Sequence, residues 1–277
     1  MPELPEVETV CLALSKIIYN SRVSNVEIFR KDLRWNIKEN LETGLKEKIL
    51  KKPFRRGKYI LIPTSTEHIL LIHLGMSGTI KIKTGGYNLS KHDHVKINIE
   101  TKENKFFSIL YNDPRRFGYV DFFHISKIEN HFLLKKLGVE QIKKDFNIYY
   151  LQKKISKKTK CVKNFIMDQS IIAGIGNIYA SEILHRANIN PLLAVNNLNE
   201  EQLESLIVAT RFILKKSINV GGTTIRNHMQ PDGKLGYFAQ KLKVYGKNKQ
   251  KCNKCNNLIT LINISNRSTY FCSNCQK

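Results

Sequence analysis

Four cysteines near the C-terminus constrain the fold of this chain more than any other feature. Cys252, Cys255, Cys272 and Cys275 follow the pattern C-x2-C-x16-C-x2-C. Two such pairs are typical ligands of a tetrahedral structural zinc ion, because four thiolates leave no open coordination position. Disulfide bonds are the alternative, but they fit poorly in a chain that we expect to be cytosolic. The spacing therefore predicts one structural Zn²⁺ in a module with too little core to fold without it.

The remaining composition indicates an ordinary globular protein. The chain has 277 residues, of which 42% are hydrophobic and 9% aromatic, enough for two or three modest domains. No apolar run approaches the ~20 residues of a membrane span, and the N-terminus lacks the basic and apolar regions of a signal peptide. We therefore expect a cytoplasmic protein with no membrane partner. Cys11 and Cys161 stand singly in apolar surroundings and are expected in the core.

The charge balance points to a polyanionic partner. Lysine and arginine total 46 against 23 acidic residues, which gives a formal net charge of +23. A chain this basic is expected to bind nucleic acid through its phosphates. Part of the excess has another explanation, because lysine, isoleucine and asparagine are used heavily throughout, as AT-biased coding would produce. The charge alone therefore gives moderate support to a nucleic-acid partner.

The hydrophobic pattern changes character along the chain. Apolar residues over 7–18 recur at helical spacing, and short strand-like runs separated by turn residues fill roughly 22–124. From about 126 to 220 the pattern is helical and includes ENHFLLKKLG, NIYASEILHRA and NEEQLESLIVATRFILKKSI. A loop over 221–240 follows. We expect a β-rich domain, a helical domain and the small zinc module.

The opening segment, MPELPEVETV, has two interpretations. Pro5 followed by Glu6 and Glu8 is ordinary chemistry for the start of a helix. The other interpretation is catalytic, because removal of Met1 would expose the secondary amine of Pro2. An α-amine has a pKa of roughly 7.7–8 against ~10.4 for lysine, so more of it is neutral and nucleophilic at pH 7. Its imine would keep a positive charge, and Glu3 is placed to transfer protons.

Other stretches supply groups suited to DNA. RRGKYILI offers a lysine after a glycine turn, and NDPRRFGY offers two arginines and a phenylalanine between strands. An aromatic tip flanked by arginines suits a wedge that enters the base stack. GIGNIYASE places Asn177 at a helix start, where backbone N–H groups bind phosphate. The alternatives are that Met76 and Phe117 are core residues, that DPRRFG is a plain turn and that the GIG glycines merely end a segment.

Taken together and in order, these stretches resemble one family. MPELPEVETV, RRGKY, HLGMSG, KHDHV, DPRRFG, GIGNIYASE, GGTT, DGKLGYFAQ and CSNCQK are similar to the motifs of bacterial formamidopyrimidine-DNA glycosylase. The resemblance covers the whole chain. The related endonuclease VIII group is less similar, since it begins PEGPE where this chain has PELPE.

The resemblance implies an α+β multidomain fold. An N-terminal catalytic β-sandwich with flanking helices would occupy 1–135, and a helical helix-two-turn-helix DNA-binding domain 136–228. A lesion-capping loop or linker would follow over 229–244, and a four-cysteine zinc-finger hairpin over 245–277. The implied partner is double-stranded DNA containing oxidised purines or abasic sites. We expect a monomer that is associated with the nucleoid when it acts.

The same resemblance implies the catalytic set. Pro2 matches the nucleophile that attacks C1′ of the damaged nucleotide, and Glu3 matches the catalytic acid, with Glu6 as a supporting acid. Lys58 matches a lysine at a hairpin tip that serves proton transfer and phosphate contact. Arg267 matches the zinc-module arginine associated with elimination and phosphate binding.

DNA contacts are implied in the same way. Three side chains match those that fill the space left by the flipped base: Met76, Arg115 and Phe117. Residues associated with DNA binding are His73, His92, Arg115, Arg116, Lys158 and Asn177, although the basic run around Lys158 aligns in more than one way. Two positions depart from the family. Asn256 replaces the usual glycine after the second cysteine, and Asn164 replaces a frequent proline after Lys163. Asparagine tolerates the left-handed conformation, so the zinc site should survive.

The expected reaction is base excision repair of oxidised purines such as 8-oxoguanine and formamidopyrimidines. It would proceed by glycosidic cleavage through a Schiff base, followed by β- and δ-elimination at the resulting abasic site. Two rivals remain. One is a glycosylase for oxidised pyrimidines. The other is a zinc-ribbon nucleic-acid-binding protein without catalysis, although Pro2, Glu3, Lys58 and Arg267 are all present.

Overall fold

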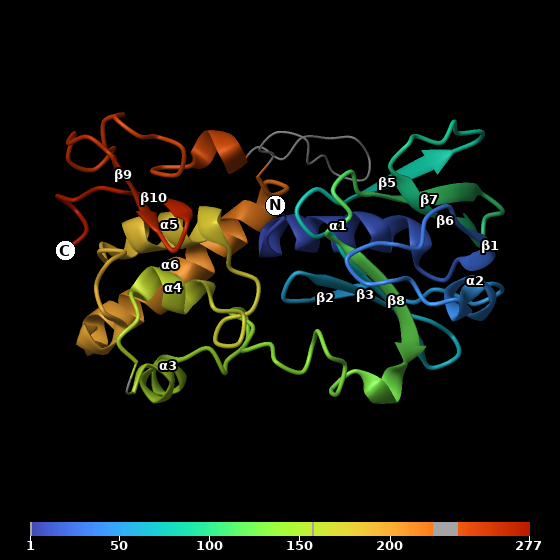
Figure 1. Ribbon diagram of the computed structural model, residues 1–277, viewed down its shortest axis with the longest axis horizontal. Helices are drawn as coiled ribbons and strands as arrows, with labels where there is room; N and C mark the ends of the chain where they lie inside the picture. The colour runs from blue at the N-terminus through green and yellow to red at the C-terminus, as the bar shows by residue number, and fades with distance from the viewer. Residues whose placement is uncertain (1, 157, 224–237) are drawn as a thin grey trace. The chain divides into compact units, whose positions relative to one another are not determined.

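The computed structural model describes residues 2–156, 158–223 and 238–277. They form two compact units, the first of Met1–Lys135 with Val220–Ala239 and the second of Lys136–Asn219 with Gln240–Lys277. Figure 1 labels most of their helices and strands. The helices are α1 (Leu4–Ile18), α2 (Asn40–Leu45), α3 (Ile148–Ile155), α4 (Val162–Met167), α5 (Asn177–Ala187) and α6 (Glu200–Asn219), with 3-10 turns at Ile125–Lys127, Val195–Asn197 and Phe238–Lys241.

The first unit is built on two antiparallel four-stranded sheets. Their strand orders are β1-β6-β7-β5 and β2-β3-β4-β8. The strands are β1 (Arg22–Ile28), β2 (Phe54–Arg56), β3 (Tyr59–Pro63), β4 (His68–His73), β5 (Thr79–Thr84), β6 (Asp93–Glu100), β7 (Phe106–Asn112) and β8 (Tyr119–His124). Side chains of both sheets share one hydrophobic core, which makes the unit a β-sandwich.

Helix α1 packs into this core along one face. Val7, Val10, Cys11, Leu14 and Ile18 are all at most 3% exposed and belong to the core cluster. The helix begins earlier than the periodicity predicts, at Leu4 rather than at residue 7, because its first turn is fixed by proline and a carboxylate cap. Burial raises the pKa of the Cys11 thiol to about 12, as expected for a core cysteine.

The second unit combines helices with the cysteine hairpin. Helices α4, α5 and α6 enclose Phe165, Tyr179 and Leu206, each fully buried. Between the two cysteine pairs lies the two-stranded sheet of β9 (Thr260–Ile264) and β10 (Arg267–Phe271). Glu182 on α5 joins the two parts, since its carboxylate accepts backbone N–H groups of Lys243, Val244 and Tyr245 at 2.8–3.0 Å.

Two sequence expectations are wrong. ENHFLLKKLG (129–138) forms successive turns rather than a helix. The reason is that the end of this segment pairs with residues 169–172 instead of continuing a helix. Gly138 N–H donates to the Gln169 carbonyl, and Val139 forms a parallel bridge with Ile172. A Cβ on Gly138 would lie 2.1 Å from the Ile171 carbonyl oxygen, so the close approach needs glycine. Cys161 is not a core thiol but lies partly exposed at the N-cap of α4.

The expected lesion-capping loop over 229–244 falls largely outside the described residues. Of that range, the structure describes 238–244, which begin with the short turn Phe238–Lys241. Within the described parts of the chain, no helix is long and apolar enough to cross a membrane.

Candidate active site

The N-terminal segment places two carboxylates beside Pro2. Glu3 is the N-cap of α1 and is 2% exposed, and Pro2 before it is buried. Glu6, 3% exposed, accepts the backbone N–H of Glu3 at 2.9 Å and that of Thr223 at 2.7 Å. The interpretation of this stretch as a helix start is therefore correct. It does not conflict with the catalytic interpretation, because the buried Glu3 directly follows Pro2 in the chain.

Lys58 lies at the tip of the β2–β3 hairpin, in the two-residue turn Gly57–Lys58. Gly57 has φ of +58°, a conformation that glycine adopts without strain. The Arg55 side chain ties this hairpin to α1. Its Nε donates to Glu8 at 2.8 Å and its Nη1 to the Gly57 carbonyl at 2.9 Å. Because Arg55 is only 5% exposed, the pair fixes Lys58 relative to the helix that follows Pro2.

The DPRRFG turn is organised by one buried carboxylate. Asp113 is 0% exposed. Its Oδ1 accepts the Ser77 hydroxyl at 2.6 Å, and its Oδ2 accepts the Gly118 N–H at 2.8 Å and the Tyr111 hydroxyl at 3.1 Å. Ser77 belongs to the HLGMSG turn, so Asp113 also joins the two turns. DPRRFG is consequently a rigid platform for Arg115, Arg116 and Phe117 rather than a passive connection.

Met76 and Phe117 project from these two turns into solvent. Met76 is 43% exposed and Phe117 is 41% exposed, so the alternative that they are core residues is wrong. Gly75 permits the close approach, because a Cβ there would lie 2.4 Å from the Phe117 backbone. The Arg115 guanidinium lies 4.6 Å from the centre of the Phe117 ring.

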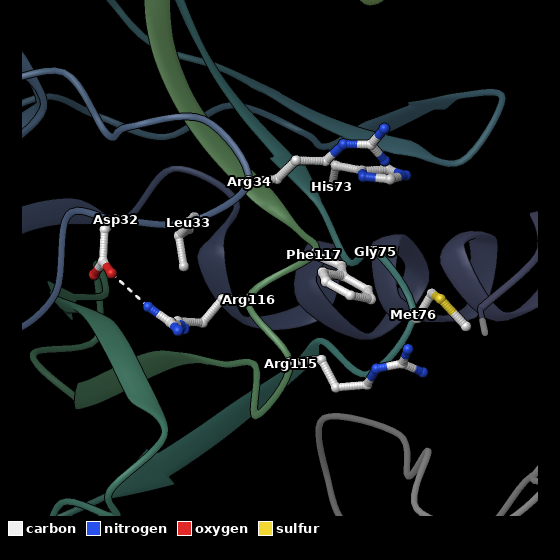
Figure 2. Close-up of a pocket in the computed structure, with 9 residues that line it drawn as sticks. All are labelled: Asp32, Leu33, Arg34, His73, Gly75, Met76, Arg115, Arg116 and Phe117. Atoms are coloured by element: carbon white, nitrogen blue, oxygen red, sulfur yellow. Dashed lines mark hydrogen bonds and ion pairs between the residues drawn. The ribbon is translucent and has the colours of Figure 1, made fainter.

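An open pocket of about 700 Å³ connects these residues with the loop after β1. It is lined by Asp32, Leu33, Arg34, His73, Gly75, Met76, Arg115, Arg116 and Phe117 (Figure 2). The structure thus gathers His73, Met76, Arg115, Arg116 and Phe117 of the predicted set on one surface. Three arginines line that surface and one acid does, so it favours an anionic ligand.

His73 lies partly buried at one side of this pocket. Its ring stacks on Tyr59 with 4.7 Å between centroids, and its Nδ1 has no hydrogen-bond partner among the described residues. Burial, assisted by the charges of Lys58 and Arg34, lowers the pKa of His73 to about 4. The imidazole is therefore neutral at pH 7. His92, also predicted, lies before β6 and is partly exposed.

Arg116 points in a different direction from its neighbours (Figure 2). Its backbone has φ of +57°, the left-handed region that few non-glycine residues occupy. Its guanidinium forms an ion pair with Asp32, which also binds Arg30. The Arg30 guanidinium lowers the pKa of the Asp32 carboxyl, so this carboxylate is charged at neutral pH.

In the second unit, the hairpin that carries Arg267 is held on both sides. Its tip residues Ser265 and Asn266 have φ of +49° and +59°, as a tight hairpin turn requires. Asn164 Nδ2 donates to Ser265 Oγ at 2.8 Å. Asn177 Nδ2 donates to the Ser268 carbonyl at 2.8 Å. Arg267, the first residue of β10, is exposed between these contacts.

A fully buried lysine completes the support of this hairpin. Lys163 is 1% exposed, and its Nζ donates to Thr269 Oγ1 at 2.6 Å. Thr269 in turn donates to the Arg267 carbonyl at 3.1 Å. The predicted residue Lys158 is not part of this network; its ammonium lies 6.0 Å above the Phe165 ring.

The four cysteines of the C-terminal motif converge. Their sulfur atoms all lie within 4.8 Å of one another, and none of the six cysteines forms a disulfide. The Sγ atoms of Cys252 and Cys275 are 3.9 Å apart, and those of Cys255 and Cys272 are 3.4 Å apart. In a tetrahedral site with Zn–S bonds of about 2.3 Å, neighbouring sulfurs are separated by about 3.8 Å, which is close to both distances. The cluster therefore fits a zinc ion. Asn256 has φ of +63°, so asparagine adopts there the left-handed conformation that the sequence predicts.

Sequence reasoning missed the residues that support the site rather than those that face the ligand. Asp113 carried a usable signal, because Asp-Pro initiates turns. Arg55 and Glu8 gave none, since nothing in the sequence pairs positions so far apart. Nothing in the sequence distinguishes Asp32 and Lys163 from the many other charged residues of this basic chain.

The first unit presents Arg115 and Phe117 on an exposed turn and holds two buried acids after Pro2. The second unit carries a four-cysteine hairpin with an exposed arginine. These features define a DNA-processing enzyme with a zinc finger. Comparison with known families specifies it. Residues 1–120 match the formamidopyrimidine-DNA glycosylase N-terminal domain, residues 137–229 the formamidopyrimidine-DNA glycosylase H2TH domain, and residues 249–277 the zinc finger found in FPG and IleRS.

Individual proteins of known family are similar to this chain over its full length. Formamidopyrimidine-DNA glycosylase of Rickettsia canadensis is 40% identical over 276 residues, covering 100% of this chain and 99% of that protein. A mutant Lactococcus lactis FPG in complex with a Fapy-dG containing DNA has a TM-score of 0.91 at 33% identity, with 100% of both chains covered. The Lactococcus lactis Fpg bound to an abasic site containing DNA has a TM-score of 0.91 at 33% identity, with 99% of both chains covered. The chain belongs to the formamidopyrimidine-DNA glycosylase family, which is a family of glycosylases with AP lyase activity.

Proposed function

We propose that this chain removes oxidised purines, including 8-oxoguanine and formamidopyrimidines, from duplex DNA and then cleaves the strand by β- and δ-elimination. The observation that carries the proposal is the N-terminus, where Pro2 directly precedes the buried acid Glu3. Glu6, the supporting acid, accepts the backbone N–H of Glu3 at 2.9 Å and so fixes the position of Glu3. An amine beside a proton-transferring carboxylate suits imine chemistry at a sugar carbon.

In this proposal, the nitrogen of Pro2 bonds to C1′ while the glycosidic bond breaks and the base leaves. Pro2 loses its own proton as this bond forms. The C1′–O4′ bond of the sugar ring then breaks, with O4′ taking a proton, and an iminium between Pro2 and C1′ results. The iminium draws electrons from the opened sugar, so that loss of a proton from C2′ expels the 3′ phosphate, and a second elimination expels the 5′ phosphate. Glu3 moves protons at the reacting centre. Lys58 and Arg267 bind the flanking phosphates as these become leaving groups. A zinc ion on the four cysteines would supply structure only, since no coordination position would remain open.

Recognition would rest on the wedge. Extrusion of a paired base costs a few kcal/mol, and insertion of Phe117 with Met76 and Arg115 would offset part of that cost. His73, His92, Arg116 and Asn177 would hold the backbone, with Lys158 as a further candidate. We expect the enzyme to act as a monomer on DNA in the bacterial cytoplasm.

The test compares two lesions in one duplex sequence. Strand cleavage of 8-oxoguanine opposite cytosine should be much faster than that of thymine glycol, and both new ends should carry phosphate, as δ-elimination requires. Preference for thymine glycol would favour the oxidised-pyrimidine rival. Binding without cleavage of either lesion would favour the non-catalytic rival.

A further inference from the structure

Asp32 is an acid among basic residues in a loop that lines the pocket. The loop runs from β1 to α2 and begins FRKDLRW, with Arg30, Lys31 and Arg34 around the aspartate. Buried side chains anchor it, because Leu33 is 8% exposed and Ile37 3% exposed. The backbone N–H groups of both also donate to the Lys31 carbonyl at 3.0 Å. Asp32 therefore has a defined position beside the DPRRFG turn.

One carboxylate binds two guanidinium groups at this position. Asp32 Oδ1 accepts Arg30 Nε at 2.6 Å, and Oδ2 accepts Arg30 Nη2 at 3.1 Å as well as Arg116 Nη1. The left-handed backbone of Arg116 and its N–H bond to the Asp113 carbonyl at 3.2 Å orient that side chain toward Asp32. Figure 2 shows the Arg116 side chain extended toward Asp32, while Arg115 extends the other way.

The contact is open to competition. The side chains of Asp32, Arg116 and Arg30 are 56%, 42% and 50% exposed, and exposed ion pairs are weak. A phosphate presents the same kind of oxygen pair to a planar guanidinium as a carboxylate does. A DNA phosphate that binds Arg116 must therefore replace Asp32 or approach it against like-charge repulsion.

We propose that Asp32 is a positioning residue that weakens charge-driven binding of DNA by occupying Arg116 in the unbound protein. The contact between Arg116 and phosphate is then an exchange of one anion for another rather than the capture of a free cation. In a chain with a net charge of +23, this exchange limits adhesion to undamaged duplex. The inference rests on the proposed DNA contact of Arg116.

The experiment measures binding of a fluorescent, undamaged duplex over a range of salt concentrations. Asp32→Asn should bind about fivefold more tightly at low salt, the factor equivalent to one unit charge at about 4 Å in water. Its plot of log K against log salt should steepen by up to about 0.9. Asp32→Glu, which keeps the charge, should stay close to the parent protein.

Two comparisons separate this role from a general charge effect. Glu39→Gln makes the same change in net charge on the same loop, at a side chain that is 92% exposed and pairs with Lys31 at 3.7 Å; it should change affinity and slope much less. In an Arg116→Ala background, Asp32→Asn should have no effect, because Asp32 acts through Arg116.

Three results would overturn the proposal. One is that Asp32→Asn weakens binding as much as Arg116→Ala, which would mean that Asp32 prepares Arg116 for phosphate. Another is that Asp32→Asn and Glu39→Gln behave alike. The third is an unchanged affinity in Arg116→Ala, which removes the contact on which the inference rests. None of these depends on lesion cleavage by the parent protein, so a failure of the proposed reaction is recognised separately.

Discussion

Single buried carboxylates position the exposed groups of the site. Asp113 accepts hydrogen bonds from two turns, and Glu6 accepts the backbone N–H groups of Glu3 at the start of α1 and of the distant Thr223. Removing the partner of such a buried group costs about 1–3 kcal/mol. Phe117 can therefore remain exposed without becoming mobile, which is the property that a wedge needs.

The wedge gives a prediction at this scale. Phe117→Ala should slow excision of 8-oxoguanine from a paired site more than cleavage of a pre-formed abasic site, because only the former requires a base to be extruded. Arg115→Ala should slow both reactions, since the unpaired partner base loses a polar contact in each. Single-turnover rates on matched duplexes would measure this, and equal losses for Phe117→Ala on the two substrates would contradict it.

His73 gives a prediction about pH. Its native pKa of about 4 lies below the ordinary value of 6.5, so the unfolded chain binds a proton that the native state refuses. The burial of neutral His73 contributes fully to the stability of the folded protein above pH 6.5. That contribution to the free energy of unfolding declines as the pH falls toward 4. Urea unfolding between pH 7 and 5.5 should therefore show a smaller loss of stability for His73→Gln than for the parent protein. Parallel curves for the two proteins would refute the assignment.

At the scale of elements, the clearest device is the clamp on the β9–β10 hairpin. Donors from α4 and from the start of α5 hold both Ser265 and Ser268, on either side of Arg267. A hairpin of two five-residue strands is marginal alone. The contacts from the helices therefore compensate for its small size.

Asn164, at the position where the family often has proline, should contribute measurably to this clamp. Its hydrogen bond to Ser265 is exposed and therefore among the weaker ones. Asn164→Ala should lower the rate of strand cleavage at an abasic site about two- to threefold, which corresponds to about 0.5 kcal/mol. Ser265→Ala should cause the same loss, and the double variant no more than either single one. Asn164→Pro should retain α4, because proline fits a first helical turn. Losses that add in the double variant would show that the two side chains act separately.

Sequence patterns predicted elements with a strong local cause and missed those decided by distant contacts. The periodicity of α1 and α5, the cysteine spacing and the glycine turn before Lys58 are local signals. ENHFLLKKLG is apolar at helical spacing, yet its end pairs with 169–173 and the helix is lost. The predicted site residues came from the family motifs. Their supports Arg55–Glu8 and Asp32–Arg116 join positions 47 and 84 residues apart, which no local pattern encodes.

At the scale of the whole molecule, the C-terminal module depends on its proposed metal. Its core is a small cluster around Val244, Ile259 and two of the cysteines, too little to offset the entropy of ordering the segment. Cys272→Ser or removal of zinc by a chelator should unfold the module and weaken binding of damaged duplex by about tenfold or more, because the contacts of Arg267 with DNA would be lost. Circular dichroism and a zinc assay would follow the first effect. Normal DNA binding by a zinc-free preparation would contradict it.

Reductive trapping shows directly whether the amine of Pro2 attacks the damaged nucleotide. Protein with Met1 removed should form a covalent complex with 8-oxoguanine duplex in the presence of borohydride, and mass spectrometry of the digested complex should locate the sugar remnant on Pro2. Pro2→Gly and protein that retains Met1 should give little or no such complex while still binding DNA. A remnant on Lys58, or full strand cleavage by protein that retains Met1, would show that Pro2 is not the nucleophile.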